Sequence, residues 1–342
     1  MNRFSGKTVV VTGATAGVGR AVAVAFAKEG ARLVLMARDQ DALEELKAEL
    51  AQCGGESFTY PLDVADADAV LSAGEDVEAR IGPIDIWVNN AMATVIAKIR
   101  DIKPDEFRRV TEVTYLGAVH GTMAALRAMG PRKRGTIVQV GSGLAYRGIP
   151  LQAAYCGAKH ALRGFTDALR TELKHENSNV KLTMVHLPAI NTPQFDWARN
   201  TRPEEPRPVA PVYTPEVAAQ AILKAAAAPA REYWLGGTTV MMILGNMIFP
   251  QMLDRKLGKE GVDGQERGVP RRERPDNLWS SVPGAHRTAG SFGDEARDRA
   301  LLLPGAAGRM GSVLAGGMLC AAVGGLLLGR RQSRHRLPSS RR

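Results

Sequence analysis

The sequence predicts an α/β fold in which a doubly wound, mostly parallel sheet is covered by helices on both faces. Short runs of aliphatic and β-branched residues recur through the first 240 residues, and stretches with helical periodicity separate most of them. Alternating β and α units of this kind predict a parallel sheet with flanking helices. A segment of this length can form one domain around a single core. We therefore expect one domain over residues 1–240 and a C-terminal extension after it.

The predicted elements alternate along this domain. The strand-like runs are residues 8–11, 33–36, 57–60, 84–89, 136–140, 181–186 and 232–235. The helical stretches include residues 41–51, 104–129 and 153–175. This alternation is typical of a doubly wound sheet, in which ligands bind beyond the carboxyl ends of the strands.

The first strand leads directly into a glycine-rich turn. The turn carries Gly13, Gly17 and Gly19 and is followed by a helical stretch over residues 20–29. Glycines allow a tight turn and a close backbone approach, so that a pyrophosphate can sit at the helix N-terminus. Three glycines at one strand–helix junction favour a dinucleotide site over an ordinary βα turn, although the spacing is Gly-x-x-x-Gly-x-Gly.

The second strand ends at a residue that bears on the choice of dinucleotide. An acidic side chain near this position binds the ribose 2′-hydroxyl of NAD, whereas an arginine accommodates the 2′-phosphate of NADP. Here Arg38 follows the strand and Asp39 comes next. We predict that NADP(H) is preferred. NAD(H) is the alternative, in which Arg38 is a solvated loop charge and Asp39 does the selecting.

Tyr155 and Lys159 stand four residues apart in a predicted helix, on one face of it. A free phenol has a pKa near 10, and a nearby ammonium lowers that pKa. The pair therefore has the character of a general acid/base, and the hydroxyl of Ser142 could hold a carbonyl oxygen beside it. The spacing alone is common by chance, as a half-buried tyrosine beside a solvated lysine. The glycine turn upstream favours the catalytic interpretation.

Together these motifs resemble the short-chain dehydrogenase/reductase family. The matching positions keep the family's order and spacing over residues 1–240. They are Thr12-Gly13-x-x-x-Gly17-x-Gly19, Leu62-Asp63-Val64, Asn89-Asn90-Ala91, Ser142, Tyr155-x-x-x-Lys159, and Pro188 with Thr192. The resemblance implies a Rossmann-type domain and an oxidoreductase that interconverts an alcohol and a ketone or aldehyde.

The resemblance also implies a role for each matching residue. Ser142 would hydrogen-bond the substrate carbonyl and Tyr155 would donate its proton to that oxygen. Lys159 would bind the nicotinamide ribose and lower the pKa of the phenol. The residues implied to bind the cofactor are Gly13, Thr15, Gly17, Val18, Gly19, Arg38, Asp63, Val64, Asn90, Ala91, Tyr155, Lys159, Pro188 and Thr192.

Two positions depart from the family pattern. Met92 stands where the family has a glycine, which affects packing beside the cofactor. Thr114 stands where the family has an asparagine that is thought to hold a water in the proton relay. A threonine hydroxyl lacks the geometry of an amide, so Thr114 is a candidate catalytic position whose part in the relay is open. The alternative function is therefore a catalytically weak NADP(H)-binding sensor or scaffold protein.

Residues 189–215 interrupt the alternation with six prolines. Prolines at this density disfavour helix and sheet. Phe195 and Trp197 are large apolar side chains within the segment, so we predict a substrate lid and a hydrophobic substrate. A solvated connector is the alternative.

The C-terminal extension carries most of the excess of basic over acidic side chains. The chain has a formal net charge of +10, and residues 251–342 contain 17 basic and 9 acidic side chains. We expect residues 241–309 to be largely irregular, because they are rich in glycine, proline and arginine. Nucleic-acid binding is not expected, because the arginines are not interleaved with aromatic residues and no known module is present.

Residues 310–329 contain no charged side chain and precede a basic tail over residues 330–342. Twenty helical residues span ~30 Å, the thickness of a bilayer core. We predict a membrane-associated helix, with a buried or oligomer-forming helix as the alternative. A second apolar stretch, residues 239–250, is too short to span and would form an interfacial helix or cover the active-site side.

The remaining side chains are consistent with a cytoplasmic enzyme. The histidines show no metal-ligand spacing, so we expect no metal. Cys53, Cys156 and Cys320 do not suggest a disulfide framework and fit a reducing compartment. We also expect a homodimer or homotetramer, attached to the membrane through its C-terminal segment.

Overall fold

The computed structural model describes residues 2–284 and 286–310, and within them a central sheet confirms the predicted fold class. Its eight strands lie in the order β15-β12-β7-β6-β4-β1-β2-β3. All neighbouring strands pair in parallel except β15, which runs antiparallel to β12 at one edge. The chain begins in the middle of the sheet, at β1, and winds outward in both directions, which defines a doubly wound sheet.

The strands of the central sheet are close to the predicted runs, except for β15, which was not predicted. They are β1 (Thr8–Thr12), β2 (Arg32–Ala37), β3 (Ser57–Pro61), β4 (Ile84–Asn89), β6 (Thr136–Ser142), β7 (Lys181–Leu187), β12 (Glu232–Leu235) and β15 (Leu302–Pro304). Short strands outside this sheet are β5 (Val95–Ile96), β8 (Ala189–Ile190), β9 (Arg199–Asn200), β10 (Glu204–Pro206), β11 (Val212–Tyr213), β13 (Glu266–Pro270) and β14 (Ala296–Arg297).

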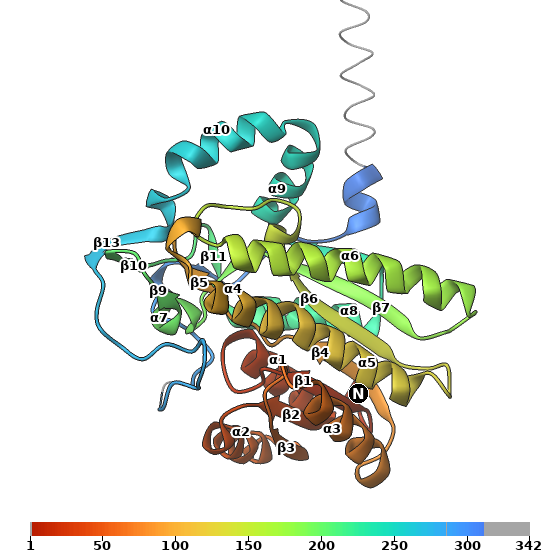
Figure 1. The fold of residues 1–342 in the computed structure, drawn as a ribbon. Coiled ribbons are helices and arrows are strands. Elements are labelled where there is room, and N and C mark those ends of the chain that lie inside the picture. The colour runs from red at the N-terminus through yellow and green to blue at the C-terminus, as the bar shows by residue number, and fades with distance from the viewer. Residues whose placement is uncertain (1, 285, 311–342) are drawn as a thin grey trace, which may run out of the picture.

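Helices cover both faces of the sheet (Figure 1). They are α1 (Gly17–Lys28), α2 (Gln40–Gln52), α3 (Ala67–Arg80), α4 (Pro104–Thr111), α5 (Gly117–Met129), α6 (Ala153–His175), α7 (Gln194–Trp197), α8 (Pro215–Ala227), α9 (Gly237–Ile248) and α10 (Pro250–Glu260). One predicted helix, over residues 104–129, is divided into α4 and α5 by a π-helical turn at Glu112–Leu116.

The core has two apolar layers, one on each face of the sheet. Side chains of α1, α2 and α8 form one layer, and side chains of α3, α5 and α6 form the other. Strand β1 serves both, because Val9 and Val11 belong to the first layer and Val10 to the second. This burial on both faces explains why the strand reads as a continuous apolar run.

The extension is folded onto the domain, so the expectation of a largely irregular segment is wrong for much of it. Helices α9 and α10 project from one side of the domain (Figure 1). Further along, β13 pairs with β10, β14 pairs with β11 and β15 joins the central sheet. These strands have two to five residues each, too few for a periodic pattern, and their pairing partners lie far away in the sequence.

Among the described residues, no helix combines the length and apolar character needed to cross a membrane. The predicted membrane-associated helix and the basic tail lie outside the described residues, apart from Met310. Cys320 lies outside them too. Cys53 and Cys156 are free thiols, the first exposed and the second buried.

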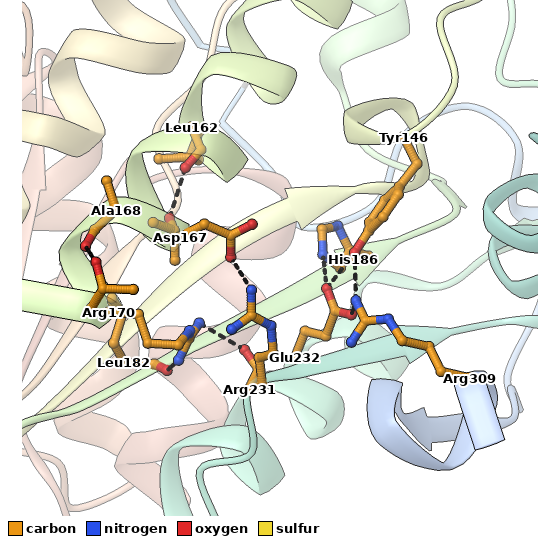
Figure 2. A network of polar contacts seen from close by, with 12 residues as sticks. Tyr146, Leu162, Asp167, Ala168, Arg170, Leu182, His186, Arg231, Glu232 and Arg309 are labelled. Carbon is orange, nitrogen blue, oxygen red and sulfur yellow. Dashed lines mark hydrogen bonds and ion pairs between the residues drawn. The ribbon is translucent and has the colours of Figure 1, made fainter. Parts of the chain in front are cut away.

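A buried polar network joins β6, β7 and β12 (Figure 2). The carboxylate of Glu232 accepts a hydrogen bond from the Tyr146 hydroxyl at 2.6 Å, lies 3.0 Å from His186 Nε2 and pairs with Arg309. Burial raises the pKa of Glu232, but its bonds to His186 and Tyr146 and the charge of Arg309 outweigh burial and hold that pKa at about 2. His186 Nδ1 lies 3.0 Å from the carbonyl oxygen of Ser142.

Removing the carboxylate of Glu232 should destabilise the fold strongly, because it removes the buried partner of the Tyr146 hydroxyl and of the His186 imidazole and breaks the ion pair with Arg309. For Glu232→Ala we expect the free energy of unfolding to fall by about 3–5 kcal/mol, measured by urea denaturation. Asp167→Ala is the matched control, since it removes a carboxylate from the exposed ion pair with Arg231 (Figure 2). That variant should lose less than about 1 kcal/mol. Equal losses in the two variants would contradict the structural role of the network.

Candidate active site

A cavity of about 870 Å³ opens beyond the carboxyl ends of the central strands. This is the position at which doubly wound folds bind their ligands. The cavity brings together all the site residues predicted from the sequence except Gly19 and Thr114. Those that line it are Gly13, Thr15, Gly17, Val18, Arg38, Asp63, Val64, Asn90, Ala91, Ser142, Tyr155, Lys159, Pro188 and Thr192.

The glycine turn forms one wall of the cavity. Gly13 and Gly17 have φ angles of 64° and 55°, which other residues rarely adopt. A Cβ on Gly13 would lie 2.8 Å from the Ala91 Cα. Gly19 faces away from the cavity, and a Cβ there would lie 2.0 Å from the carbonyl oxygen of Gly13. Gly19 therefore acts by allowing the turn to fold.

The start of α1 is suited to an anion. Its N-cap, Ala16, provides no side-chain hydrogen bond, and no acidic residue lies in the first turn. The partial positive charge of a helix N-terminus favours a phosphate when no side chain satisfies it. The turn, the helix start and the size of the cavity therefore fit a dinucleotide.

Ser142, Tyr155 and Lys159 meet at the other end of the cavity. Ser142 is the last residue of β6, its Oγ accepts the Leu144 N–H at 3.1 Å, and its side chain lowers the pKa of the nearby Tyr155 phenol. Tyr155 and Lys159 share one face of α6, as their spacing predicts, and Lys159 Nζ lies 5.6 Å from the centroid of the Tyr155 ring. Lys159 is buried and donates to the carbonyl oxygen of Val140 at 2.7 Å.

The expectation that Lys159 lowers the pKa of the Tyr155 phenol is wrong for this structure. Burial raises the pKa of Tyr155, and the side chain of Ser142 opposes that rise only in part. The predicted lowering by Lys159 is not seen, because desolvation is the larger effect and the ammonium is bonded to Val140. Burial also lowers the pKa of Lys159 to about 8. The phenol is therefore protonated at neutral pH, ready to act as an acid.

Thr114 lies outside the cavity, in the π-helical turn. Its hydroxyl accepts the N–H of Ala93 and donates to the carbonyl oxygen of the same residue, each at 2.9 Å. These two bonds tie the helix to the segment after β4. Thr114 therefore has a structural contact, and nothing in its geometry supports the catalytic position that the resemblance implies. Met92, the other departure from the family pattern, lines the cavity.

We call the part of the cavity lined by Arg38, Asp63 and Val64 the adenosine end, after the group that the family resemblance predicts there. Here Asp63 and Arg38 have hydrogen-bond and ion-pair partners that the sequence did not reveal. Asp63 forms a close ion pair with Arg109, a buried side chain of α4. Arg38 donates to the carbonyl oxygen of Asn277 at 2.7 Å, in the extension. Arg109 sits within a charged helical stretch, where nothing marks it as different from its neighbours. The extension carries no motif that would bring it to this site.

Residues 189–215 contribute Phe195 and Trp197 to the cavity lining, and Trp197 is buried. The segment also contains α7 and short strands, although its prolines disfavour regular structure. Its contact with the cavity is what a substrate lid requires. Movement of the segment stays a prediction.

Comparison with known proteins agrees with this geometry. Residues 7–203 match the family model of short chain dehydrogenases. The chain belongs to the short-chain dehydrogenase/reductase family and is an oxidoreductase of that family. It is 31% identical over 289 residues to the uncharacterized oxidoreductase YxnA of Bacillus subtilis, covering 84% of this chain and 81% of that protein. It is 32% identical over 230 residues to 3-dehydrosphinganine reductase of Danio rerio, covering 65% of this chain and 69% of the relative.

Other relatives and solved structures are also similar to this chain. Dehydrogenase/reductase SDR family member 7B of Mus musculus is 39% identical, with 54% of this chain and 58% of the relative covered. Among solved structures, an alcohol dehydrogenase from the archaeon Thermococcus sibiricus complexed with 5-hydroxy-NADP has a TM-score of 0.58 and 29% identity. That match covers 95% of the archaeal chain but 67% of this one. A metagenomic short-chain oxidoreductase in complex with NADP matches with a TM-score of 0.55 and 28% identity, over 66% of this chain and 92% of that one.

The close packing at Gly19 leads to a stability prediction. Gly19→Ala should lower the free energy of unfolding by about 1–3 kcal/mol, because its Cβ would overlap the carbonyl oxygen of Gly13. Gly164→Ala is the matched control. It lies within α6 with no atom within 4 Å of a new Cβ, so it should gain about 0.5–1 kcal/mol. Urea denaturation of both variants measures the difference, and a Gly19→Ala protein as stable as the wild type would contradict the packing.

Proposed function

We propose that this dehydrogenase is an NADP(H)-dependent oxidoreductase that interconverts an alcohol and a ketone or aldehyde, with Tyr155 as general acid/base. The observation that supports it best is that Ser142, Tyr155 and Lys159 face the same cavity as the glycine turn. A bound nicotinamide cofactor supplies the hydride. The proton, the orientation of the substrate and the electrostatic stabilisation come from the chain itself.

The geometry suggests how these side chains act in the direction of reduction. Ser142 and Tyr155 both line the cavity and interact with each other, so both hydroxyls can donate to one carbonyl oxygen. The raised pKa of Tyr155 keeps the proton on the phenol until negative charge develops on that oxygen. The phenol then gives up its proton to that oxygen, and Ser142, which opposes the rise in the pKa of Tyr155, favours the phenolate that results.

Two features support NADP(H) over NAD(H). Arg38 lines the adenosine end, where its guanidinium can pair with a 2′-phosphate. Asp39, the residue that would select NAD(H), is already engaged, since it accepts the N–H of Ala42 at 3.0 Å and lies 3.3 Å from His286 Nε2. The two solved relatives described with 5-hydroxy-NADP and NADP support the same choice.

Replacing the phenol tests the mechanism. Tyr155→Phe should lower NADPH-dependent carbonyl reduction by about 10²–10⁴-fold, because the ring keeps its shape but loses the proton. NADPH binding, followed by fluorescence titration, should change little. Tyr60→Phe is the matched control, because its hydroxyl bonds Asp76 away from the cavity, and its turnover should match the wild type. Wild-type turnover in Tyr155→Phe would refute the catalytic role.

A second candidate function, an NADP(H)-binding sensor of low activity, is favoured by one observation. The hydroxyl of Thr114 is bonded to Ala93, so it does not supply the side chain that the family uses to hold a relay water. Binding of NADPH by the wild type, without turnover across a broad panel of carbonyl compounds, would favour the sensor.

The lining of the cavity points to an apolar substrate. It includes Leu144 and Ile149 from the segment after β6, Met241 and Met242 from α9, and Leu253 and Leu257 from α10. The apolar surface continues outward, where Met247, Ile248, Phe249 and Met252 are exposed at the junction of the two helices. We infer that the substrate is a ketone or aldehyde with an extended hydrocarbon chain.

This inference predicts how activity depends on chain length. In a series of aliphatic ketones of increasing length, kcat/KM should rise about fourfold with each methylene that the cavity buries. This factor corresponds to about 0.8 kcal/mol of binding free energy per methylene. Met242→Ser should flatten the dependence, because it makes the lining polar. Val269→Ser is the control, since this exposed side chain does not line the cavity. Higher kcat/KM for short polar ketones than for long ones would contradict the inference.

A further inference from the structure

Part of the extension crosses the adenosine end of the cavity. Residues 277–287, called the strap below and described except at position 285, contribute Asn277, Ser281, Val282 and His286 to the cavity lining. The strap belongs to the part of the chain beyond the region that matches the family model.

The first half of the strap is held by two arginines of the domain. Arg38 Nη2 donates to the carbonyl oxygens of Asn277 at 2.7 Å and Ser280 at 3.4 Å. Arg109 Nε donates to the carbonyl oxygen of Leu278 at 3.0 Å. The side chain of Leu278 is fully buried and belongs to the apolar layer formed by α3, α5 and α6. This half of the strap is therefore fixed by an apolar anchor as well as by polar bonds.

The second half of the strap is attached to the glycine turn. The N–H of Gly17 donates to the carbonyl oxygen of Arg287 at 3.0 Å, and Arg20 donates to that of His286 at 3.4 Å. His286 is largely buried and lies 3.3 Å from a carboxylate oxygen of Asp39. The strap is thus fastened on both sides of the region where Arg38 and the first turn of α1 would meet the adenosine phosphates.

The strap contacts the domain at the adenosine end and leaves a cavity beside these contacts. The guanidinium of Arg38 and the N–H of Gly17 both donate to strap carbonyl oxygens. Arg38, Asp63 and Val64 nevertheless line the same cavity as the four strap residues. The volume of about 870 Å³ lies in the range of sites that enclose a small molecule or cofactor.

We propose that the strap is the outer wall of the adenosine end of the cofactor site, and that NADP(H) enters and leaves only when this wall opens. The inference rests on the proposed function, because it concerns the same cofactor. The closed strap excludes water from the phosphates, which strengthens their attraction to Arg38. It also holds the guanidinium of Arg38 by backbone carbonyl oxygens, so that this side chain is oriented before the cofactor arrives.

Loosening the strap tests the proposal without any need for turnover. Leu278→Ala removes the apolar anchor, and Leu278 does not line the cavity. Because a buried Leu→Ala change weakens the closed form, we expect the Kd for NADPH to rise about tenfold or more, through faster dissociation. Fluorescence titration and stopped-flow dissociation measure both quantities. Gly293→Ala is the control: it lies just beyond the strap with no atom within 4 Å of a new Cβ, and should bind as the wild type does.

A second variant keeps the test decisive if Leu278→Ala fails to fold. The ring of Trp279 is more than half exposed and packs over the guanidinium of Arg109, with 5.9 Å between the Arg109 Cζ and the ring centroid. Trp279→Ala therefore weakens the strap from outside the core and should also raise the Kd. Hydrogen exchange provides an independent readout: NADPH should slow exchange in peptides that cover residues 277–284.

The outcomes separate this inference from the proposed function. Tight NADPH binding by the wild type with unchanged Kd in both variants would refute the wall alone. A lower Kd in the variants, or faster exchange in the strap when NADPH is added, would show instead that the strap competes with the cofactor, and would also refute it. Failure of the wild type to bind NADPH would refute the proposed function, and the inference with it.

Discussion

The close approach of β1 to β4 at their carboxyl ends is the constraint on which the site depends. Asn90 Nδ2 donates to the carbonyl oxygens of Thr12 and Gly13 at 3.0 and 3.1 Å, and the hydroxyl of Thr12 accepts the N–H of Asn90 at 3.0 Å. These bonds determine where the chain leaves the sheet and where α1 begins. A Cβ on Gly13 would meet the backbone of Ala91, so this arrangement requires glycine.

The end of the cavity at Ser142, Tyr155 and Lys159 depends on a buried polar network. The carbonyl oxygen of Ser142 bonds to His186, which is paired in turn with Glu232 and, through it, with Arg309. Buried charges are tolerated only when they are paired and hydrogen-bonded, and this network meets that condition. The hydroxyl of Ser142 faces the cavity while a charged network holds the backbone of the same residue from the other side.

The extension contacts both ends of the cavity. Arg309 reaches the network behind Ser142, and the strap encloses the adenosine end. The region that matches the family model thus contains the glycine turn, Ser142, Tyr155 and Lys159, and the extension contributes further residues to the same cavity.

The sequence by itself determined the features that depend on local structure. The alternation of strands and helices, the glycine turn, and the shared face of Tyr155 and Lys159 follow from backbone conformation and helical period, and the structure has all three. Tertiary structure decided the rest, because burial and pairing depend on segments far apart in the sequence. It reversed the expected direction of the Tyr155 pKa through desolvation, and it bonded Thr114 to Ala93 away from the cavity. It also brought the strap to Arg38 through backbone carbonyl oxygens, which every residue carries and which therefore leave no pattern in the sequence.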